Sequence, residues 1–198
     1  MVNVDNLQTE FIPETPAAEQ PKTRSSHVVL DVIETLLLAL VLFVGINLIT
    51  ARIRVDGLSM EPTLHNGEYV LVNRLAYKWA KPRLGDVIVF RFPRNPRQEF
   101  IKRVIGLAGD EVYITNKQVF VNGQLLDEPY IAEAPQYFGT WRVPQNSLFV
   151  LGDNRNHSSD SQEWEYVPMQ NVVGKALVMY WPPSAWGLIG HITPRTSP

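Results

Sequence analysis

One apolar segment near the N-terminus restricts this chain more than any other feature. Residues 35–51 carry no charge and no proline, and the apolar character begins at Val28, interrupted only by Asp31, Glu34 and Asn47. A helix needs about 17–25 such residues to cross the hydrocarbon core of a bilayer. A cleaved secretory leader would start nearer the N-terminus and have a shorter apolar core. Residues 28–51 are therefore predicted to be a retained membrane anchor, with a cleaved leader or a buried soluble helix as the alternatives.

The segments at the two ends of the chain are expected to be unstructured. Residues 1–27 are polar, contain several prolines and show no apolar period, which predicts a disordered tail, and residues 191–198 are assigned to a short C-terminal tail. Basic residues stand on both sides of the anchor, with Lys22 and Arg24 before it and Arg52 and Arg54 after it. The distribution of positive charge therefore gives no orientation in the membrane.

Between these segments, residues 52–190 read as one β-rich domain. Short runs rich in Val, Ile, Phe and Tyr are separated by turn formers such as Asn66-Gly67 and Asn122-Gly123. Strands are expected at residues 68–72, 86–92, 99–106, 111–114, 118–121, 147–151 and 172–181, and a short helix at 73–80. The predicted fold class is mainly β: one N-terminal transmembrane helix followed by an antiparallel β sandwich or open barrel.

Composition excludes several classes of function. The net charge is −2 and the 18 Lys and Arg are scattered along the chain, so no nucleic-acid partner is expected. The chain has no cysteine, which rules out a thiol nucleophile, a disulfide scaffold and a thiolate metal site. A calcium loop at residues 153–160 is the remaining metal option, but it lacks the glycine and terminal glutamate of an EF-hand. No cofactor and no metal are predicted.

Ser59 and Lys102 are the residues best suited to chemistry. Ser59 comes shortly after the apolar segment, and Lys102 lies 43 residues later in the apolar run 100–106. A serine hydroxyl is a weak nucleophile unless a base lies beside it. A lysine can be that base when burial lowers the pKa of its ammonium group, and Ser-Lys pairs are a known variant of the catalytic triad. The alternative base is His157, which would need an acid partner.

Five blocks of sequence occur in an order that belongs to one family. They are the apolar segment Val28–Ile49, Ser59-Met60-Glu61-Pro62-Thr63-Leu64, and the segments 85–90, 102–110 and 152–161. Any one short motif is weak, but five in order are specific. The chain resembles the type I signal peptidases, which are membrane-bound Ser-Lys endopeptidases that remove signal peptides from exported proteins.

The resemblance implies roles for individual residues. Ser59 takes the place of the nucleophile and Lys102 that of the general base. Ser158 matches the serine that orients the lysine, and Asp160 matches the acid that holds its loop together. Supporting roles are expected of Arg103, and of Asp153 and Arg155, whose ion pairs are expected within their own turn. Gly57 stands where part of the family has a serine hydroxyl for the oxyanion, which leaves the Ser59 backbone amide as the expected donor.

The resemblance also implies partners and a location. The expected substrates are the signal peptides of preproteins with small residues at positions −1 and −3 from the cut, bound by shallow apolar pockets to which Ile53, Val55 and the Lys102 strand contribute. The lipid bilayer and the protein export translocon are further expected partners. The catalytic domain of this single-pass protein is expected on the trans side of its membrane, facing the periplasm, the cell exterior or a thylakoid lumen.

Two positions depart from the family pattern, and two other functions compete. Gln162 stands where a basic residue is usual, which removes a partner of Asp160, and Glu165 stands where glycine is usual. A self-cleaving repressor shares the Ser-Lys chemistry but carries a DNA-binding domain instead of an apolar helix. A catalytically silent membrane-anchored β module is the second rival.

Five large apolar side chains are each expected in the core, and the alternative is that one or two of them insert into lipid. They are Leu58, Trp79, Trp141, Trp181 and Trp186.

Overall fold

The computed structural model describes residues 24–190. The predicted C-terminal tail and most of the predicted N-terminal tail lie outside these residues. Residues 24–27, which were assigned to the N-terminal tail, belong to the first helix instead. The described residues fall into two compact units, which divide between Phe43 and Val44 of the first helix.

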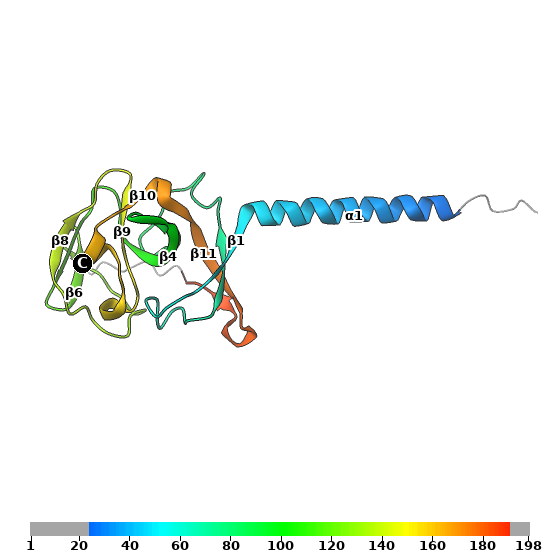
Figure 1. The fold of residues 1–198 in the computed structure, drawn as a ribbon. Coiled ribbons are helices and arrows are strands. Elements are labelled where there is room, and N and C mark those ends of the chain that lie inside the picture. The colour runs from blue at the N-terminus through cyan, green and yellow to red at the C-terminus, as the bar shows by residue number, and fades with distance from the viewer. Residues whose placement is uncertain (1–23, 191–198) are drawn as a thin grey trace, which may run out of the picture. The chain divides into compact units, whose positions relative to one another are not determined.

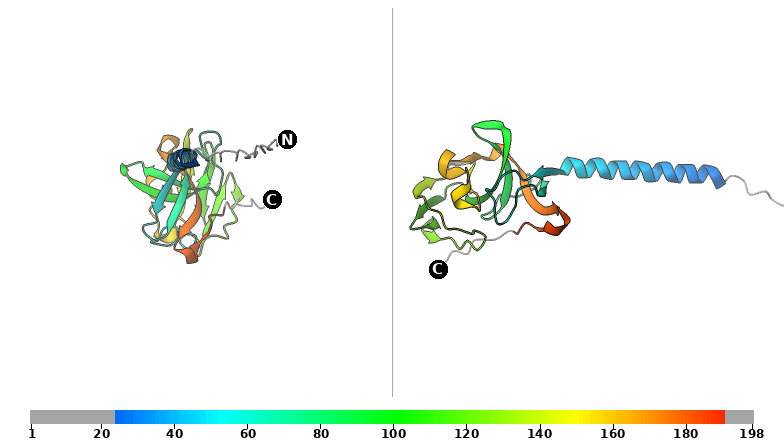
Figure 2. Two further views of the ribbon diagram at one scale, coloured as in Figure 1. Left: turned by 90° about the vertical axis from the view of Figure 1, so that its right-hand side faces the viewer. Right: turned by 60° about the horizontal axis from the view of Figure 1, so that its bottom comes forward.

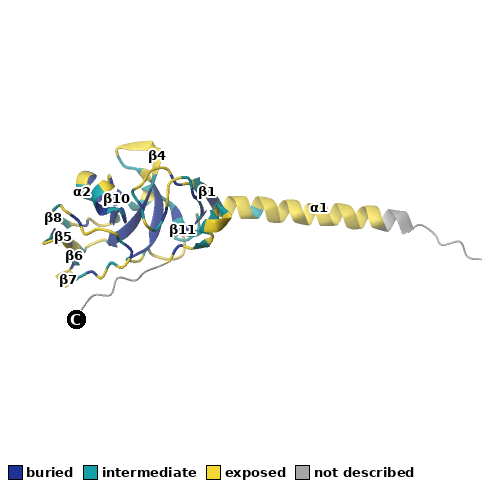
Figure 3. Ribbon diagram, turned by 90° about the horizontal axis from the view of Figure 1, so that it is seen from below, coloured by how far each residue is buried: buried dark blue, intermediate teal, exposed yellow. Residues whose placement is uncertain are grey.

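Helix α1 (Arg24–Ile49) contains the apolar segment. Its section Val28–Ile49 is 22 residues long with a mean hydropathy of 2.5, and none of that section is buried against the rest of the protein. In Figure 3 the ribbon of this section is coloured as exposed almost throughout. A helix of 22 residues is about 33 Å long, which matches the hydrocarbon thickness of a bilayer. The helix ends two residues before the predicted anchor does, because Thr50 and Ala51 begin the first strand.

The large sheet carries most of the β domain, and all of its strand pairs are antiparallel. The strand order is β1-β2-β11-β3-β4-β9-β10, with β12 paired to β11. These strands are β1 (Thr50–Arg54), β2 (Tyr69–Asn73), β3 (Val87–Phe92), β4 (Asn95–Gly106), β9 (Ser147–Leu151), β10 (Val167–Pro168), β11 (Val172–Trp181) and β12 (Gly187–Leu188). In Figure 1, β1 and β11 lie at one side of the domain and β9 lies toward the other.

A smaller sheet packs against β9. Its order is β7-β6-β5-β8, again with antiparallel pairs only. The strands are β5 (Glu111–Thr115), β6 (Gln118–Val121), β7 (Gln124–Leu125) and β8 (Gly139–Arg142). Short helical segments complete the chain: η1 (Arg155–His157), α2 (Ser161–Trp164), η2 (Met169–Asn171) and η3 (Pro183–Ala185). The predicted mainly antiparallel β fold behind one N-terminal apolar helix is confirmed.

The central strands of the large sheet are buried on both faces. Val87 and Val89 of β3 pack into one apolar cluster, whereas Ile88 and Phe90 pack into another on the opposite face. This follows from the alternation of side chains along a strand. A third cluster fills the space between β9 and the small sheet, around Phe149 and Ile114. The dark centre of the domain in Figure 3 corresponds to these strands, and the exposed start of β4 projects from it as part of a hairpin (Figures 2 and 3).

Two expectations about local structure were wrong. Residues 74–80 form turns and bends and no helix, and the one backbone hydrogen bond within the segment runs from Lys78 N to Leu75 O. Trp79, Trp181 and Trp186 are 82%, 54% and 74% exposed, and Leu58 is 54% exposed, so none of these four lies in the core. Trp141 does pack against the cluster around Phe149. An apolar side chain in a turn or at a strand end has no periodic pattern that would reveal its exposure.

Candidate active site

The loop that follows β1 holds Ser59 in a defined position. The backbone amide of Val55 donates to Glu68 O at 2.7 Å, and that of Gly67 donates to Val55 O at 2.9 Å, so the loop begins and ends at the same place. Gly57 has a φ of 97°, a left-handed conformation that favours glycine. Met60 and Leu64 are 1% and 0% exposed and anchor the loop in the core beside the half-buried Ser59.

Lys102 reaches Ser59 from β4. Its Nζ donates to Ser59 Oγ at 2.7 Å and to the carbonyl oxygen of Ile101 at 3.0 Å. The residue is 4% exposed, as its apolar neighbours predicted. Burial lowers the pKa of the Lys102 ammonium from 10.5 to about 8, although the nearby carboxylates of Asp160 and Asp153 oppose the shift. A substantial fraction of Lys102 is therefore neutral near physiological pH, and a neutral amine can accept a proton.

The polar loop after β9 packs directly onto the serine loop. The backbone amide of Asn154 donates to Ser59 O at 3.1 Å, and Asn154 Nδ2 donates to Leu58 O at 3.2 Å. A Cβ atom on Gly152 would collide with Ser59 O and with Ser158 Oγ. Only glycine at 152 lets the two loops approach this closely. Ser158 and the Ser59 backbone both lie against this glycine.

Arg103 and Asp153 join β4 to that loop by a buried ion pair. Arg103 Nε and Nη2 donate to the two Asp153 oxygens at 2.8 and 2.7 Å, and both side chains are fully buried. Arg103 Nη1 also donates to Gly85 O at 2.9 Å, and Thr63 Oγ1 donates to Asp153 Oδ2 at 2.5 Å. The guanidinium lies 4.1 Å from the centre of the Tyr130 ring. All three nitrogens of the guanidinium and both oxygens of the carboxylate therefore have a hydrogen-bond partner.

Arg155 forms a second buried pair, with Glu128. Its Nη1 and Nη2 donate to the Glu128 oxygens at 2.7 and 2.6 Å, and its Nε donates to Gly152 O at 3.0 Å. The expectation that Asp153 and Arg155 make ion pairs within their own turn was wrong. Both partners, Arg103 and Glu128, come from other segments, so these pairs fasten the loop to the body of the domain.

Asp160 and Ser158 lie close together and near Lys102. Asp160 Oδ2 accepts from Gly152 N at 2.9 Å and Oδ1 accepts from Gln162 N at 3.2 Å, so Gln162 supplies a backbone partner although it brings no basic side chain. Burial raises the pKa of the Asp160 carboxyl. Ser158 is 8% exposed, and the interaction of its hydroxyl with the Asp160 carboxylate opposes that rise in pKa.

A groove leads to Ser59 and Lys102. It has a volume of about 300 Å³ and runs between β1, which contributes Ile53 and Arg54, and residues 99–101 of β4. Val89 also lines it, while His157 and Ser159 stand at its edge. Val55, expected to line a substrate pocket, is instead buried in the core. The His157 ring is exposed and lies 3.3 Å from Asn154 Oδ1, whereas Ser59 Oγ is the partner of Lys102.

Thr63, Glu128 and Tyr130 belong to this site but were not predicted. Thr63 belongs to the sequence block of Ser59, but no role was predicted for it. No local pattern identified Glu128 as the acid that pairs with Arg155. Tyr130 OH donates to Glu128 Oε1 at 2.7 Å and orients it. In residues 24–190 no group of three or more His, Cys, Asp or Glu side chains is placed to hold a metal ion.

Comparison with known proteins agrees with this geometry. The family model described as "Signal peptidase, peptidase S26" matches residues 29–181. This chain belongs to that family. It is therefore a serine endopeptidase. The sequence is 43% identical over 195 residues to "Signal peptidase I" of Leptolyngbya laminosa, covering 94% of this chain and 95% of the relative.

Further relatives include a protein that is named as a thylakoidal peptidase. "Probable signal peptidase I-1" of Synechocystis sp. is 42% identical over 170 residues, which is 81% of this chain and 87% of the relative. "Thylakoidal processing peptidase 1, chloroplastic" of Arabidopsis thaliana is 35% identical over 141 residues, which is 66% of this chain and 42% of the relative.

Proposed function

We propose that the protein is a membrane-bound signal peptidase that uses Ser59 as nucleophile and Lys102 as general base. The observation that carries this proposal is the 2.7 Å contact between Lys102 Nζ and Ser59 Oγ, made by a lysine that is 4% exposed. The lowered pKa of Lys102, about 8, supports the role because a base must be neutral to accept a proton. Membership of the signal peptidase family supports the assignment of substrate.

The acylation step transfers one proton through Lys102. The neutral amine takes the proton of the Ser59 hydroxyl while Oγ attacks the carbonyl carbon of the scissile peptide bond. The resulting ammonium then gives that proton to the leaving nitrogen, the C–N bond breaks, and the mature protein departs with a free amino group. The signal peptide remains esterified to Ser59.

Deacylation follows the same course, with a water molecule as the nucleophile and Ser59 Oγ as the leaving group. Lys102, neutral again, takes a proton from a water molecule as its oxygen attacks the ester carbon, and Ser59 Oγ regains a proton as it leaves. Ser158 is proposed to orient Lys102 during these steps, since its hydroxyl is buried close to the Ser59 backbone and can accept a hydrogen bond while it interacts with the Asp160 carboxylate. Asp160, Asp153, Arg103 and Arg155 are proposed to hold this arrangement in place.

The oxyanion of each tetrahedral intermediate needs a donor. Gly57 has no hydroxyl to offer, so the Ser59 backbone amide is the proposed donor. Asn154 holds the carbonyl groups on both sides of that amide, those of Leu58 and Ser59. A donor fixed in this way stabilises developing charge without reorganising.

The groove suits an extended peptide with small side chains. β1 pairs only with β2, and residues 95–101 of β4 pair only with β3 among the described strands, so each presents an edge to the groove. A peptide between these edges can bond to both through its backbone. Ile53, Val89 and Ile101 leave shallow apolar space, which supports the proposed preference for small residues at −1 and −3.

Helix α1 is proposed as a single-pass anchor, with residues 52–190 as the catalytic domain on the trans side of the membrane. Its section Val28–Ile49 is long and apolar enough to span a bilayer. Signal peptides emerge from the export translocon within that bilayer, which makes the translocon a proposed partner. The likeness to both bacterial and thylakoidal enzymes is compatible with a periplasmic, external or lumenal face.

The deciding experiment is cleavage of a precursor with an Ala-x-Ala site by the full-length protein in detergent. The wild type is compared with Ser59→Ala, Lys102→Ala and His157→Gln. We expect correct cutting by the wild type and the His157 variant, and a loss of at least a hundredfold in the other two, since each removes a partner of the proton transfer.

Three results would contradict the proposal in different ways. Equal cutting by wild type and Lys102→Ala would remove the lysine from the mechanism. Loss of activity in His157→Gln alone would restore the histidine as base. No cutting by any form, beside a signal peptidase active in the same assay, would indicate a silent binding module.

A further inference from the structure

A hollow with two arginines on its wall lies where α1 joins the β domain. It has a volume of about 310 Å³, and its charged lining residues are Arg74, Arg91 and Glu99. The backbone amide of Arg74 donates to the carbonyl oxygen of Ile49, the last residue of α1, at 2.9 Å. The apolar section of α1 also ends at Ile49. Given the proposed membrane anchor, on which this inference rests, Arg74 therefore lies at the level of the lipid headgroups.

The side chains of both arginines lack a protein partner. Arg74 and Arg91 are exposed, and no hydrogen bond or ion pair joins either guanidinium to another group within residues 24–190. Their backbones are held in place, since Asn171 Nδ2 donates to Arg91 O at 3.0 Å and Arg91 belongs to β3. A guanidinium presents a planar set of donors that fits a phosphate group. The hollow can therefore offer two such sets to one oxyanion.

The charge around the hollow favours an anion. Glu99 is the one acid among its lining residues, and although it stands opposite Arg91 in the register of β3 and β4, the two form no ion pair. The loops that begin at the two arginines, residues 74–85 and 91–98, carry four and three basic residues and no acid. All of these basic residues are exposed. A surface of this kind attracts an anionic bilayer.

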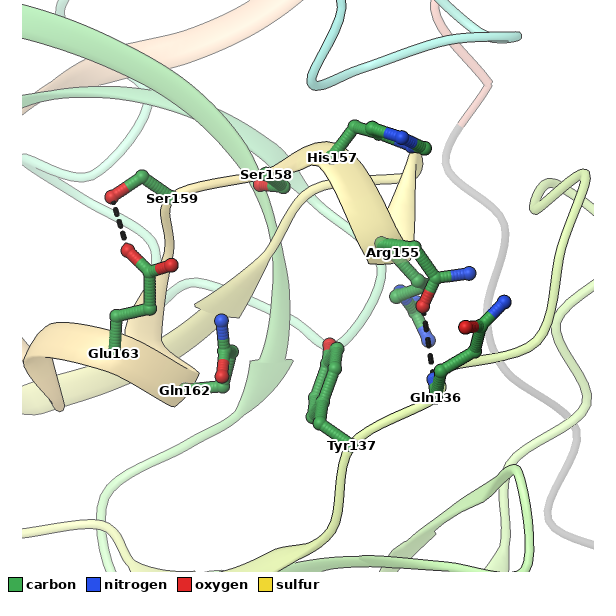
Figure 4. Close-up of a pocket in the computed structure, with 9 residues that line it drawn as sticks. Gln136, Tyr137, Arg155, His157, Ser158, Ser159, Gln162 and Glu163 are labelled. Carbon is green, nitrogen blue, oxygen red and sulfur yellow. Dashed lines mark hydrogen bonds between the residues drawn. The ribbon is translucent and has the colours of Figure 1, made fainter.

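The hollow drawn in Figure 4, at the polar end of the groove, lacks this feature. Its one arginine, Arg155, is paired with both oxygens of Glu128. The Glu163 carboxylate on its wall accepts from Ser159 Oγ at 2.7 Å, as the dashed line shows. Those charged groups are bonded within the protein, whereas the arginines beside the anchor are left for a ligand.

The hollow also adjoins the groove of the candidate active site. Glu99 lines both, and it is the groove residue of β4 that lies farthest along the strand from Lys102. We propose that Arg74 and Arg91 bind the phosphate headgroup of an anionic lipid in the leaflet next to the β domain. Together with α1, this headgroup would hold the domain to the bilayer at two points and keep the groove at the surface where a signal peptide leaves the membrane.

Titration calorimetry of the full-length protein in a non-ionic detergent tests this site. The ligand is short-chain phosphatidylglycerol, and phosphatidylcholine of the same chain length is the control lipid because its choline offsets the phosphate charge. Physiological ionic strength screens charges that are more than about 8 Å apart, which separates a site from diffuse attraction. For the wild type we expect the Kd of phosphatidylglycerol to be at least about tenfold lower than that of phosphatidylcholine.

Two double variants that remove equal charge separate the site from its surroundings. Arg74→Gln with Arg91→Gln should raise the Kd of phosphatidylglycerol about tenfold, since each loses charge-assisted hydrogen bonds. Arg94→Gln with Arg97→Gln changes exposed positions outside the hollow and should raise it less than about twofold. These exposed side chains have no printed role in packing, so both variants should keep the near-ultraviolet circular dichroism of the wild type.

Equal weakening by the two double variants would overturn the site, because it would show diffuse attraction to a basic surface. Equal Kd values for the two lipids, or displacement of phosphatidylglycerol by inorganic phosphate at the same concentration, would overturn an anionic lipid as the ligand. None of these results depends on catalysis. Cleavage of the Ala-x-Ala precursor by the same wild-type preparation tests the proposed peptidase separately, so a failure of either proposal can be told from a failure of the other.

Discussion

At the scale of the residue, the protonation of Lys102 governs the proposed chemistry. Its pKa of about 8 lies below the ordinary 10.5 because burial disfavours the ammonium form. The proposed base is active only when neutral, so activity must increase as pH rises toward 8 and level off above it. We expect log(kcat/KM) to rise by about one unit for each pH unit below 8. The measurement is a pH series with one peptide, and His157→Gln should give the same profile. A midpoint well below 8 that disappears in His157→Gln would refute the lysine base.

The buried pair of Arg103 and Asp153 should matter for stability. Arg103→Met would leave the Asp153 carboxylate buried without its main partner, which costs about 3–5 kcal/mol. Arg103→Lys keeps the charge but cannot bond to both carboxylate oxygens, so we expect a smaller loss. Denaturant unfolding of the full-length protein in detergent measures both. Arg97→Met, at an exposed position, is the matched control and should change the free energy of unfolding by less than about 0.5 kcal/mol. Similar values for all three variants would show that the pair contributes little.

Gly152 should be indispensable for a geometric reason. A Cβ there would collide with the backbone of Ser59 and with Ser158, so Gly152→Ala must displace the nucleophile or its neighbour. We expect a loss of activity of at least tenfold, since small displacements of reacting groups are costly. Gly187→Ala is the control, because its Cβ would meet only ordinary contacts at 3.6 and 3.8 Å. Peptide cleavage by the two variants, with near-ultraviolet circular dichroism to check folding, decides the matter; full activity of Gly152→Ala would contradict the close packing of the loops.

At the scale of the element, strands dominated by apolar residues were predictable, whereas two-residue strands were not. β6, β9 and β11 have the predicted bounds, because apolar residues dominate each of them. The two-residue strands β7, β10 and β12 leave no periodic signal, and β1 follows α1 without any break in apolar character. The residues of the candidate site also divide into predictable and unpredictable ones. Local context indicated Ser59 and the burial of Lys102, whereas Thr63 and Glu128 are defined by contacts across 90 and 27 residues of sequence.

The hairpin of β11 and β12 carries a prediction about lipid. Trp181, Trp186 and Leu188 are all more than half exposed on this element, and tryptophan favours the interface of a bilayer. All five tryptophans of the chain lie after residue 51, so fluorescence of the full-length protein in liposomes reports on the β domain alone. We expect brominated lipid to quench the wild type more than Trp186→Phe or Trp181→Phe. Trp164→Phe, at a buried position, is the control, and quenching that is equal in all variants would exclude this hairpin from the membrane.

At the scale of the whole molecule, the property to be measured is the membrane topology, that is, which side of the membrane the β domain faces. Basic residues flank α1 on both sides, so charge does not choose an orientation, whereas the proposed function requires the catalytic domain to face exported precursors. The chain has no cysteine, so a single introduced thiol can be labelled without background. Gln118→Cys lies at an exposed position of β6, and Ala17→Cys lies in the polar segment before the helix. In intact bacterial cells with a permeabilised outer envelope, a membrane-impermeant maleimide should label Gln118→Cys at once and Ala17→Cys only after lysis, because one spanning helix separates the two positions. The reverse pattern would place the domain in the cytoplasm and refute the proposed location, and labelling of both before lysis would show that α1 does not span the membrane.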